Sequence, residues 1–528
     1  MTGVQTCALP IWLRMSLFTQ VVVGCFEAVA ATPRPAADLS DRPIRARYDA
    51  AQDSNETKNI WSAADVLDAD AANSLAVRTK LRKRSRYERG NNGHNSGILR
   101  TEGNYVVGTG PKLRLQTNSP GFNSMVEAAF QRWMKAVGFS RKLRTMCRAK
   151  VGDGEAFCLV AANPNAADQV KLDVRLIECD QVSAPMMSAD DENYVDGIRF
   201  DDFGNPLSYD VLRRHPGANW YWASAVRREF DTFPAKFVCH WFGGDERPGQ
   251  HRGIPELAPT LNLFATGRRY REAVVAAAET AADNATMVEM GMAANGENDE
   301  VAPFTTLPID KRMMTILPAG AKSSQMKAEQ PTTTYESFNR SMICEEARPL
   351  NMPYNIAACD SSGYSYSGGQ LDHQTYFVSI DVERQDCESA VLDKVFALWF
   401  EEAVRVYGWA FEAEPVPKHA WDWMGKPHSD PTKIADSRKT RLSCGDAAPS
   451  EFASEDGVDF EDRVAALAND YGVTADEIKA KMFDANFQKS GGAPANQVDP
   501  GTQPGDGQPA KSNGVNRMAR NGHARSAV

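Results

Sequence analysis

Carboxylates between glycines come nearest, in this chain, to a catalytic or metal-binding pattern. Asp153 and Glu155 stand close together in VGDGEAF, and paired carboxylates can hold Mg²⁺ or act as acid and base. No second acidic pair has the spacing that completes a two-metal site, and the glycines form neither GxGxxG nor a GxxxxGK phosphate loop. We therefore interpret this stretch as a turn that leads into a strand.

A second polar stretch, HWFGGDERPGQHRG, could supply metal ligands or structural ion pairs. Its candidate metal donors are His240, Asp245 and His251. A nuclease or metal centre is one reading of these three. The neighbouring Arg247, Gln250 and Arg252 instead favour hydrogen bonds and ion pairs at a junction or a subunit contact, which is the interpretation we adopt.

A serine-rich stretch, DSSGYSYSGGQLDHQTYF, has residues that could include a nucleophile. It lacks the GxSxG pattern, and no strand precedes it as a nucleophile elbow requires. Its composition is typical of a mobile loop between two helices. We place the start of the following helix at Leu371, where Asp372 suits the positive end of the helix dipole. We therefore assign no catalytic residue, no cofactor site and no metal site.

Composition limits the class of protein. The 528 residues carry a net charge of −10, with 42% hydrophobic and 24% charged residues. A general nucleic-acid coat is normally basic, so this charge argues against one. No uninterrupted apolar stretch reaches the roughly 20 residues that a membrane-spanning helix needs. The 10 cysteines show no CxxC pair, and several stand in apolar stretches such as AFCLV, which predicts buried, reduced thiols.

The first elements that could position these residues are helical. Apolar residues recur every three to four positions: Leu67, Ala71, Leu75, Val77 and Leu81. A basic run overlaps this stripe: Arg78, Lys80, Arg82, Lys83, Arg84, Arg86 and Arg89. Phosphate binding is one reading of the run. We prefer a solvated or interface-pairing helix face, because its aromatic content is limited to Tyr87.

Helices and short strands then alternate, which predicts an α+β fold with a small mixed sheet packed on helices. A helix over 122–150 precedes strand-like runs such as EAFCLVAA, VRLIECD and FVCHWF. DDFGNP is typical of a turn between two strands. Apolar periodicity predicts longer helices over 256–286, 335–350 and 371–406.

The C-terminal part has a different pattern. Residues 410–486 are predicted to form a smaller helical unit, in which Thr474 caps a helix. From Ser490 onward the sequence is too poor in apolar residues to bury a core, so we expect disorder.

Taken in order, several stretches resemble the lambda-type portal proteins of tailed bacteriophages. The stretches are RYDAAQDSNETKNIWSAADVLDADAANSLAVRTKLRKRSRYERGNNGHNSGILRTEGNYVVGTGPKL, GDGEAF, IRFDDFGNPLSYDV, HWFGGDERPGQHRGIPELAP and PYNIAACDSSGYSYSGGQLDHQTYF. The resemblance spans roughly 45–470 and rests on the joint order of motifs, since no single motif is diagnostic. Gln370 departs from the pattern, because a basic residue is expected at the end of the loop motif. That departure bears on DNA-phosphate contact by this loop.

The resemblance implies a homo-oligomeric ring, usually of twelve subunits, at one capsid vertex. DNA would enter and leave through its channel, while a separate terminase supplies the motor. The implied organisation is a wing (45–253), a stem helix (254–286), a clip (287–334), a second stem helix (335–352), a tunnel loop (353–370), a long helix (371–408) and a helical crown (409–487), followed by a disordered tail (488–528).

The resemblance also implies partners and contact residues. The partners would be other copies in a dodecamer, double-stranded DNA bound without sequence specificity, the terminase large subunit, head-completion or adaptor proteins, and the major capsid and scaffold proteins, with no membrane. The expected DNA-facing residues are Ser361, Ser362, Tyr364, Ser365, Tyr366, Ser367 and Gln370. The expected stem or subunit-contact residues are Arg247, Gln250, Arg252, Arg268, Arg269 and Arg271. The expected location is the virion, at a capsid vertex, and the host cytoplasm during assembly.

Two other classes stay open at this point. One is a metal-dependent phage nuclease, or another DNA-processing enzyme, that uses Asp153, Glu155 and His240. The other is an exported adhesin or hydrolase, because the segment before AVAA near residue 30 has the shape of a secretory leader.

The first residues have a further interpretation. MTGVQTCALPI resembles the conceptual translation of a common short-read sequencing adapter, read from a GTG start. We therefore expect residues 1–11 to be an artefact, with Trp12 at the join, and residues 12–44 to be poorly structured.

Overall fold

The computed structural model of the protein describes residues 60–184, 193–218, 229–243, 247–282, 286–290, 321–325, 334–410, 415–426 and 431–487. The chain divides into two compact units, residues 1–68 and 69–528. In the first, the Ala64 amide donates to the Trp61 carbonyl (3.0 Å) within a turn. The segments interpreted as adapter (1–11), N-terminal segment (12–44) and disordered tail (488–528) lie outside the described residues.

The second unit begins with helices. They are α2 (Ala69–Ala72), α3 (Leu75–Asn91), α4 (Gly93–Val106), α5 (Pro120–Ala136) and α6 (Phe139–Asp153). Asn92 separates α3 from α4, because its backbone is extended and its side chain accepts a hydrogen bond from the His94 amide (3.1 Å). Helix is therefore confirmed in this region, although the predicted apolar stripe is on the wrong face. Leu67, Leu75 and Val77 are exposed, whereas two arginines of the basic run are buried.

Two antiparallel sheets follow these helices. The first has the order β3-β2-β8, from β2 (Glu155–Ala162), β3 (Leu172–Ile177) and β8 (Val238–Phe242). The second has the order β4-β5-β6-β7, from β4 (Tyr194–Val195), β5 (Ile198–Phe200), β6 (Pro206–Leu212) and β7 (Phe230–Pro234). The DDFGNP turn lies between β5 and β6 as predicted. The Asp201 carboxylate accepts from the amides of Phe203 (2.9 Å) and Asn205 (2.7 Å).

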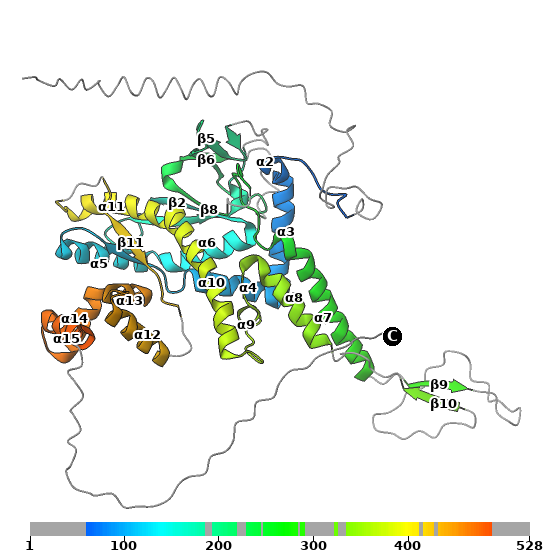
Figure 1. The fold of residues 1–528 in the computed structure, drawn as a ribbon. Coiled ribbons are helices and arrows are strands. Elements are labelled where there is room, and N and C mark those ends of the chain that lie inside the picture. Colours follow the sequence, from blue (N-terminus) through cyan, green and yellow to red (C-terminus); the bar gives the residue numbers. More distant parts are fainter. Residues whose placement is uncertain are drawn as a thin grey trace, which may run out of the picture. The chain divides into compact units, whose positions relative to one another are not determined.

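A helical hairpin comes next, with α7 (Leu261–Ala282) packed against α8 (Tyr335–Ala347); both appear in green in Figure 1. The predicted helices over 256–286 and 335–350 are confirmed. Helix α7 starts later than predicted, because the preceding residues Ala258–Thr260 form a short 3-10 turn that contains a proline. Between the two helices the structure describes an antiparallel pair, β9 (Thr286–Met290) and β10 (Ala321–Gln325). Most of the predicted clip lies outside the described residues.

A long helical run covers 366–407. It consists of α10 (Tyr366–Cys387), one π-helical turn (Glu388–Leu392) and α11 (Asp393–Tyr407), and it follows the short α9 (Tyr354–Ala357). The predicted helix over 371–406 is confirmed, but it begins five residues earlier. The Ser365 hydroxyl accepts from the Gly368 amide (3.2 Å) and caps α10. Residues 366–370, expected in the loop, therefore form the first turns of the helix.

The region after α11 departs from the predicted all-helical unit. Strand β11 (His419–Asp422) pairs antiparallel with β1 (Lys112–Leu115), so the chain returns to the helices near its start. The helical unit itself comprises α12 (Pro431–Cys444), α13 (Pro449–Glu455), α14 (Phe460–Tyr471) and α15 (Ala475–Phe487). Thr474 caps α15 as expected, accepting from the Glu477 amide (3.3 Å).

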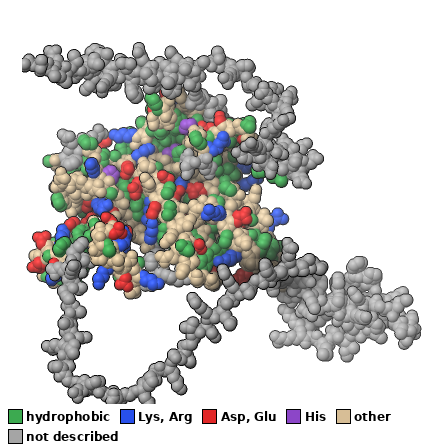
Figure 2. All heavy atoms as spheres, in the orientation of Figure 1, with side chains coloured by type: hydrophobic (Ala, Val, Ile, Leu, Met, Phe, Trp, Pro, Cys, Tyr) green, Lys and Arg blue, Asp and Glu red, His purple; other side chains and the backbone are tan. Residues whose placement is uncertain are grey.

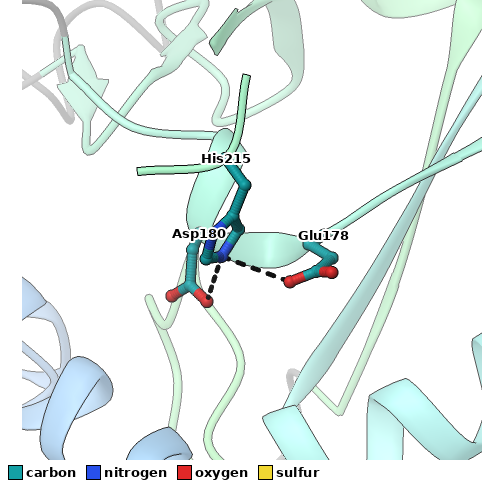
Figure 3. A group of neighbouring side chains, drawn as sticks. All are labelled: Glu178, Asp180 and His215. Carbon is teal, nitrogen blue, oxygen red and sulfur yellow. Dashed lines mark hydrogen bonds and ion pairs between the residues drawn. The ribbon is translucent and has the colours of Figure 1, made fainter. Parts of the chain in front are cut away.

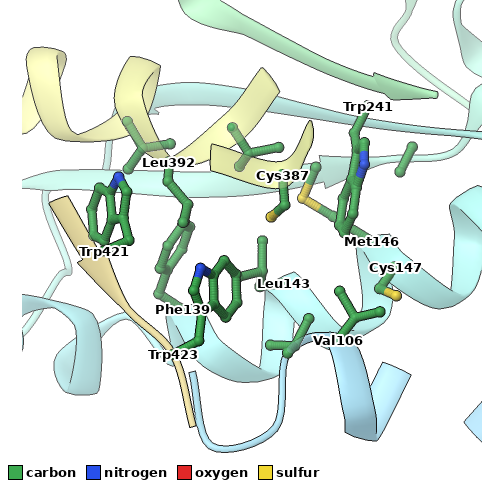
Figure 4. Close-up of a cluster of buried hydrophobic side chains, with 14 of the residues drawn as sticks. Val106, Phe139, Leu143, Met146, Cys147, Trp241, Cys387, Leu392, Trp421 and Trp423 are labelled. Carbon is green, nitrogen blue, oxygen red and sulfur yellow. The ribbon is translucent and has the colours of Figure 1, made fainter. Parts of the chain in front are cut away.

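One large apolar core joins α4, α5, α6, β2, α10, the π turn, α11 and the β11 segment. Figure 4 shows Trp421 and Trp423 on one side of this core and Trp241 on the other, with Phe139 and Leu143 of α6 between them. The cysteine prediction is only partly right, since five described thiols are buried and Cys344, Cys359 and Cys444 are exposed.

Candidate functional site

Glu155, the first residue of β2, lies at the centre of a buried ionic junction. The Arg252 guanidinium donates to both Glu155 oxygens, with Nη2 at 2.6 Å from Oε1 and Nε at 3.0 Å from Oε2. The Arg82 guanidinium of α3 donates to the same Oε1, and His240 Nε2 of β8 lies 3.1 Å from Oε2. Glu155 and Arg252 are both fully buried.

The charges of this junction compensate one another. Burial alone would raise the pKa of Glu155, but Arg252 and Arg82 hold that pKa well below its ordinary value. Burial lowers the pKa of His240, whose ring stacks between Phe157 and Phe242 at centroid distances of 4.2 Å each. We infer a neutral imidazole that donates from Nε2 to the carboxylate.

This geometry leaves Glu155 without an open position for a metal ion, because guanidinium groups take the places where a cation would bind. Asp153 pairs instead with Arg86 (2.8 Å), and His251 Nδ1 pairs with Asp70 (2.6 Å). The nuclease reading of Asp153, Glu155 and His240 is therefore not supported. Asp245 lies outside the described residues.

The basic run of α3 is split between the interior and the surface. Arg78 and Arg82 are each 1% exposed, and Arg78 pairs with Asp196 (2.5 Å), which also binds Arg252 (3.0 Å). The expectation of a solvated face is wrong for these two residues. Their acidic partners come from strands and loops far along the chain, which periodicity on α3 alone does not show.

The residues expected at a stem or subunit contact occupy different environments. Arg252 is fixed inside the chain, and Gln250 is buried with its amide donating to the Arg252 carbonyl (2.9 Å), so both belong to the junction. Arg247 and Arg269 are exposed.

The other two arginines, both on α7, contact neighbours within the chain. Arg268 pairs with Glu88 of α3 (3.1 Å) and lies over the Tyr87 ring, and Arg271 donates to Asn339 of α8 (3.1 Å). Arg268 therefore ties α7 to α3, and Arg271 ties it to α8.

The expected DNA-facing loop is tied to α8 by one arginine. The guanidinium of Arg340 lies over the rings of Tyr354 (4.3 Å) and Tyr364 (5.3 Å). Tyr364 is consequently half-buried.

The other expected loop residues differ in exposure. The serines of the stretch are exposed: Ser361, Ser362, Ser365 and Ser367. Gln370 lies on α10 and lines an open groove together with Arg384, Trp423 and Arg438. The Tyr366 side chain lies outside the described part.

A group of three possible metal donors was missed by sequence reasoning. Glu178, Asp180 and His215 bring one donor atom each within 4.8 Å of one another, as Figure 3 shows. Asp180 also pairs with Arg86 (2.5 Å) and Arg82 (3.3 Å), so two guanidiniums already compensate it. We interpret the group as part of the ionic junction. His215 is distant in sequence from the two acids, so no spacing pattern could have indicated it.

A second buried polar cluster joins α6 to α10. Lys150 Nζ pairs with Glu383 (2.5 Å) and Glu256 (2.8 Å). Close by, the Tyr376 hydroxyl donates to Glu102 of α4 (2.9 Å). Burial and the charge of Glu256 raise the pKa of Glu102 to about 8, and burial and the same charge raise that of Glu383 to about 7. The sequence gives no sign of this cluster, since its members come from four separate segments.

Comparison with known protein families shows which family this chain belongs to. The family model described as phage portal protein, lambda family, matches residues 57–382, which is more than half of the chain. The chain belongs to this family. It is therefore a structural, non-enzymatic protein of a phage particle, and the resemblance inferred from the sequence is confirmed.

Individual relatives are distant. A curated "Probable portal protein" of Halomonas phage phiHAP-1 is 23% identical over 292 residues, covering 52% of this chain and 54% of the relative, so the chain spans about half of that protein's length. Among solved structures, the neck of a native gene transfer agent particle computed with C12 symmetry aligns at a TM-score of 0.42 and 14% identity, covering 73% of this chain and 94% of the other. An HK97-family phage portal protein from Corynebacterium diphtheriae aligns at a TM-score of 0.26 and 11% identity, covering 69% and 97%.

The described residues contain no helix that is both long and apolar enough to cross a membrane.

Proposed function

We propose that the protein is the portal of a phage head, a homo-oligomeric ring of twelve copies at one capsid vertex. DNA would pass through the ring during packaging and ejection, and the ring would dock the terminase and then the head-completion proteins. The observation that carries this proposal is the family match over 57–382, which runs without a break from the segment before α3 into α10.

The division into parts follows from the family and from the order of elements. We assign residues 45–253 to the wing, α7 and α8 to the stem, 287–334 to the clip and α12 to α15 to the crown. Arg268 and Arg271 support a rigid stem, because they tie α7 to α3 and to α8. We assign the loop before α10 to the channel wall.

The charge distribution suits DNA that slides. Acidic side chains gather over α14 and α15 in Figure 2, and the chain as a whole carries a charge of −10. A ring built from chains of net negative charge is not expected to grip phosphate. Exposed hydroxyls such as those of Ser361 and Ser362 can contact phosphate oxygens weakly and reversibly.

A packaging assay tests the proposed function. Heads would be assembled from the capsid and scaffold proteins of the same phage, with or without this chain, and supplied with terminase, ATP and DNA. We expect nuclease-protected DNA only in heads that contain the chain. Equal protection in heads that lack it would contradict a portal role.

A further inference from the structure

Helix α10 carries a second apolar face that points away from the core. Leu371, Val378 and Val382 are 65%, 65% and 53% exposed. Spacings of seven and four residues place them on one face of the helix. Tyr376 and Ile380 lie on the opposite face and are buried. A solvent-facing apolar stripe of this kind on a helix is typical of a protein–protein contact.

The surroundings of this stripe are acidic. The exposed charged side chains of α10, within its described part, are Asp372, Asp381 and Asp386. The one arginine of the helix, Arg384, is buried and donates to the carbonyl of Val106 (3.0 Å). Asp381 pairs with Lys426 and lies 3.9 Å from Arg384, so it is compensated within the chain. The apolar stripe is therefore flanked by the carboxylates of Asp372 and Asp386, which favour a positive partner.

A cluster of four arginines provides such a positive surface. Its members are Arg89 of α3, Arg100 of α4, and Arg144 and Arg148 of α6. Partial burial lowers the pKa of Arg148, and the charges of Arg100, Arg89 and Arg144 lower it further, so these three guanidiniums lie near enough to repel Arg148.

The partners that the structure gives these arginines are neutral. Arg148 donates to the Asn104 amide oxygen (3.3 Å), and Arg144 donates to the Gly108 carbonyl (2.5 Å). Among the described residues, no carboxylate forms an ion pair with any of the four. No described carboxylate of the same copy therefore compensates the repulsion that acts on Arg148.

The arginine cluster is also held in place. A Cβ atom added at Gly103 of α4 would come within 3.1 Å of Arg148 Nε, so the Arg148 side chain packs closely across this glycine. This packing keeps positive charge on the surface of α4.

The two faces lie on opposite sides of the α4 and α6 layer. Glu102 contacts Tyr376 of α10, whereas Arg100, two residues earlier, lies about 200° around α4. Lys150 likewise contacts Glu383 of α10, whereas Arg148, two residues earlier, faces the other way. Figure 1 shows α10 running across α4 and α6. One copy therefore carries a negative, apolar face and a positive face on opposite sides.

We infer that the outer face of α10 packs against the arginine cluster on a second copy of this chain. Two different, complementary faces on opposite sides of one subunit are what a head-to-tail contact needs, and head-to-tail contacts close into rings. This inference rests on the proposed ring and names the surfaces that form it.

Duplex DNA is the other candidate occupant of the arginine cluster. It explains the cluster alone and leaves the apolar stripe of α10 exposed, whereas a second copy accounts for both surfaces at once. The net charge of −10 also opposes DNA as the general partner of this chain.

Analytical ultracentrifugation of the full chain tests the inference with two variants. They are Val378→Lys on the α10 face, which places a cation against the arginines, and the double variant Arg89→Glu, Arg100→Glu on the arginine face. The three changed residues lie at exposed positions, so folding should persist, which circular dichroism checks. Matched controls are Val406→Lys on α11 and Lys135→Glu on α5, both exposed. We expect about tenfold or greater weakening of self-association in both variants and none in the controls.

A charge exchange makes the test specific. Adding Asp372→Arg and Asp386→Arg to the arginine-face variant exchanges two charges between the two surfaces of every copy, and we expect assembly to recover in part. If a variant fails to fold, Val378→Gln and Arg100→Gln replace it.

The outcomes separate the two hypotheses. Wild-type protein that stays monomeric contradicts the proposed ring and this inference with it. If the wild type forms a ring and both Val378→Lys and the arginine-face variant still form it, the ring stands and this inference is overturned. Normal rings that lose DNA retention in the arginine-face variant would assign the cluster to DNA instead.

Discussion

The carboxylate of Glu155 lies between the guanidiniums of Arg82 and Arg252 and the imidazole of His240. Residue types that suit acid–base or metal chemistry are here used to join β2, α3 and the segment before α7. Removing one member of such a buried set leaves an uncompensated charge, whose cost is far larger than that of a surface pair. The junction should therefore be sensitive to single substitutions.

Arg252→Met is expected to destabilise the fold by about 3–5 kcal/mol, because it leaves Glu155 and Asp196 without their shared cation. Urea unfolding of the full chain measures the loss. Arg213→Met is the matched control, since Arg213 is 56% exposed and pairs with Asp231 at the surface, where a pair contributes about 0–1 kcal/mol. Equal losses in the two variants would contradict a structural junction.

Glu102→Gln is expected to flatten the pH dependence of stability. The Glu102 carboxyl keeps its proton up to a pKa of about 8 in the folded chain, whereas the unfolded carboxyl ionises near its ordinary value. The folded state thus binds more protons between these values, so its stability falls as pH rises from about 5 to 8, by up to about 1.4 kcal/mol per pH unit. Unfolding free energies at pH 5 and pH 8 measure the slope.

The variant removes the contribution of Glu102 alone, and the neighbouring Glu383, whose pKa burial raises to about 7, still titrates in this range. The glutamine side chain can accept the hydrogen bond of the Tyr376 hydroxyl in place of the Glu102 carboxyl group. Glu279→Gln, at an exposed position on α7, is the control and should keep the wild-type slope. If the unfolding free energies of wild type and Glu102→Gln change equally with pH, the raised pKa of Glu102 is contradicted.

At the scale of elements, the sequence was sufficient where local signals agree. Apolar periodicity placed α7, α8 and the run from α10 to α11, and turn residues placed the hairpin between β5 and β6. The start of α10 was misplaced because Gly368 and Gly369 disfavour helix, while the Ser365 cap and tertiary packing override them.

Other elements could not be predicted because their causes are distant in the chain. Leu75 and Val77 gave α3 an apparent apolar stripe. The face that packs inward is instead the one whose arginines form ion pairs with Asp196, Glu155 and other acids. Strand β11 was missed since its partner β1 lies some 300 residues earlier, with Leu113 opposite Trp421.

The loop before α10 is expected to act on DNA and not on assembly. Deleting 361–364 removes exposed serines and Tyr364 but spares the Ser365 cap, whereas deleting 361–369 would also remove the first turn of α10. We expect the shorter deletion to form rings of normal size and to package or retain less DNA in assembled heads.

A suitable control for this deletion is Arg340→Ala, which releases Tyr364 without shortening the loop. Normal DNA packaging and retention by the 361–364 deletion would contradict the assignment of this loop to the channel.

At the scale of the whole molecule, the order of motifs was more informative than any one of them. No catalytic pattern stands out among the motifs, and the joint order of stretches across roughly 45–470 indicates the family that the match over 57–382 confirms. The surfaces that would close a ring could not be read from the sequence, because Arg100 and Val378 acquire opposite directions only once α4, α6 and α10 are packed.

Electron microscopy of the purified full chain tests the central claim most directly. Twelve copies of a 58.0 kDa chain make a particle of about 700 kDa. We predict ring-shaped class averages with a central hole and cyclic symmetry, twelvefold in the simplest case. Monomers, or closed particles without a central hole, would contradict the account.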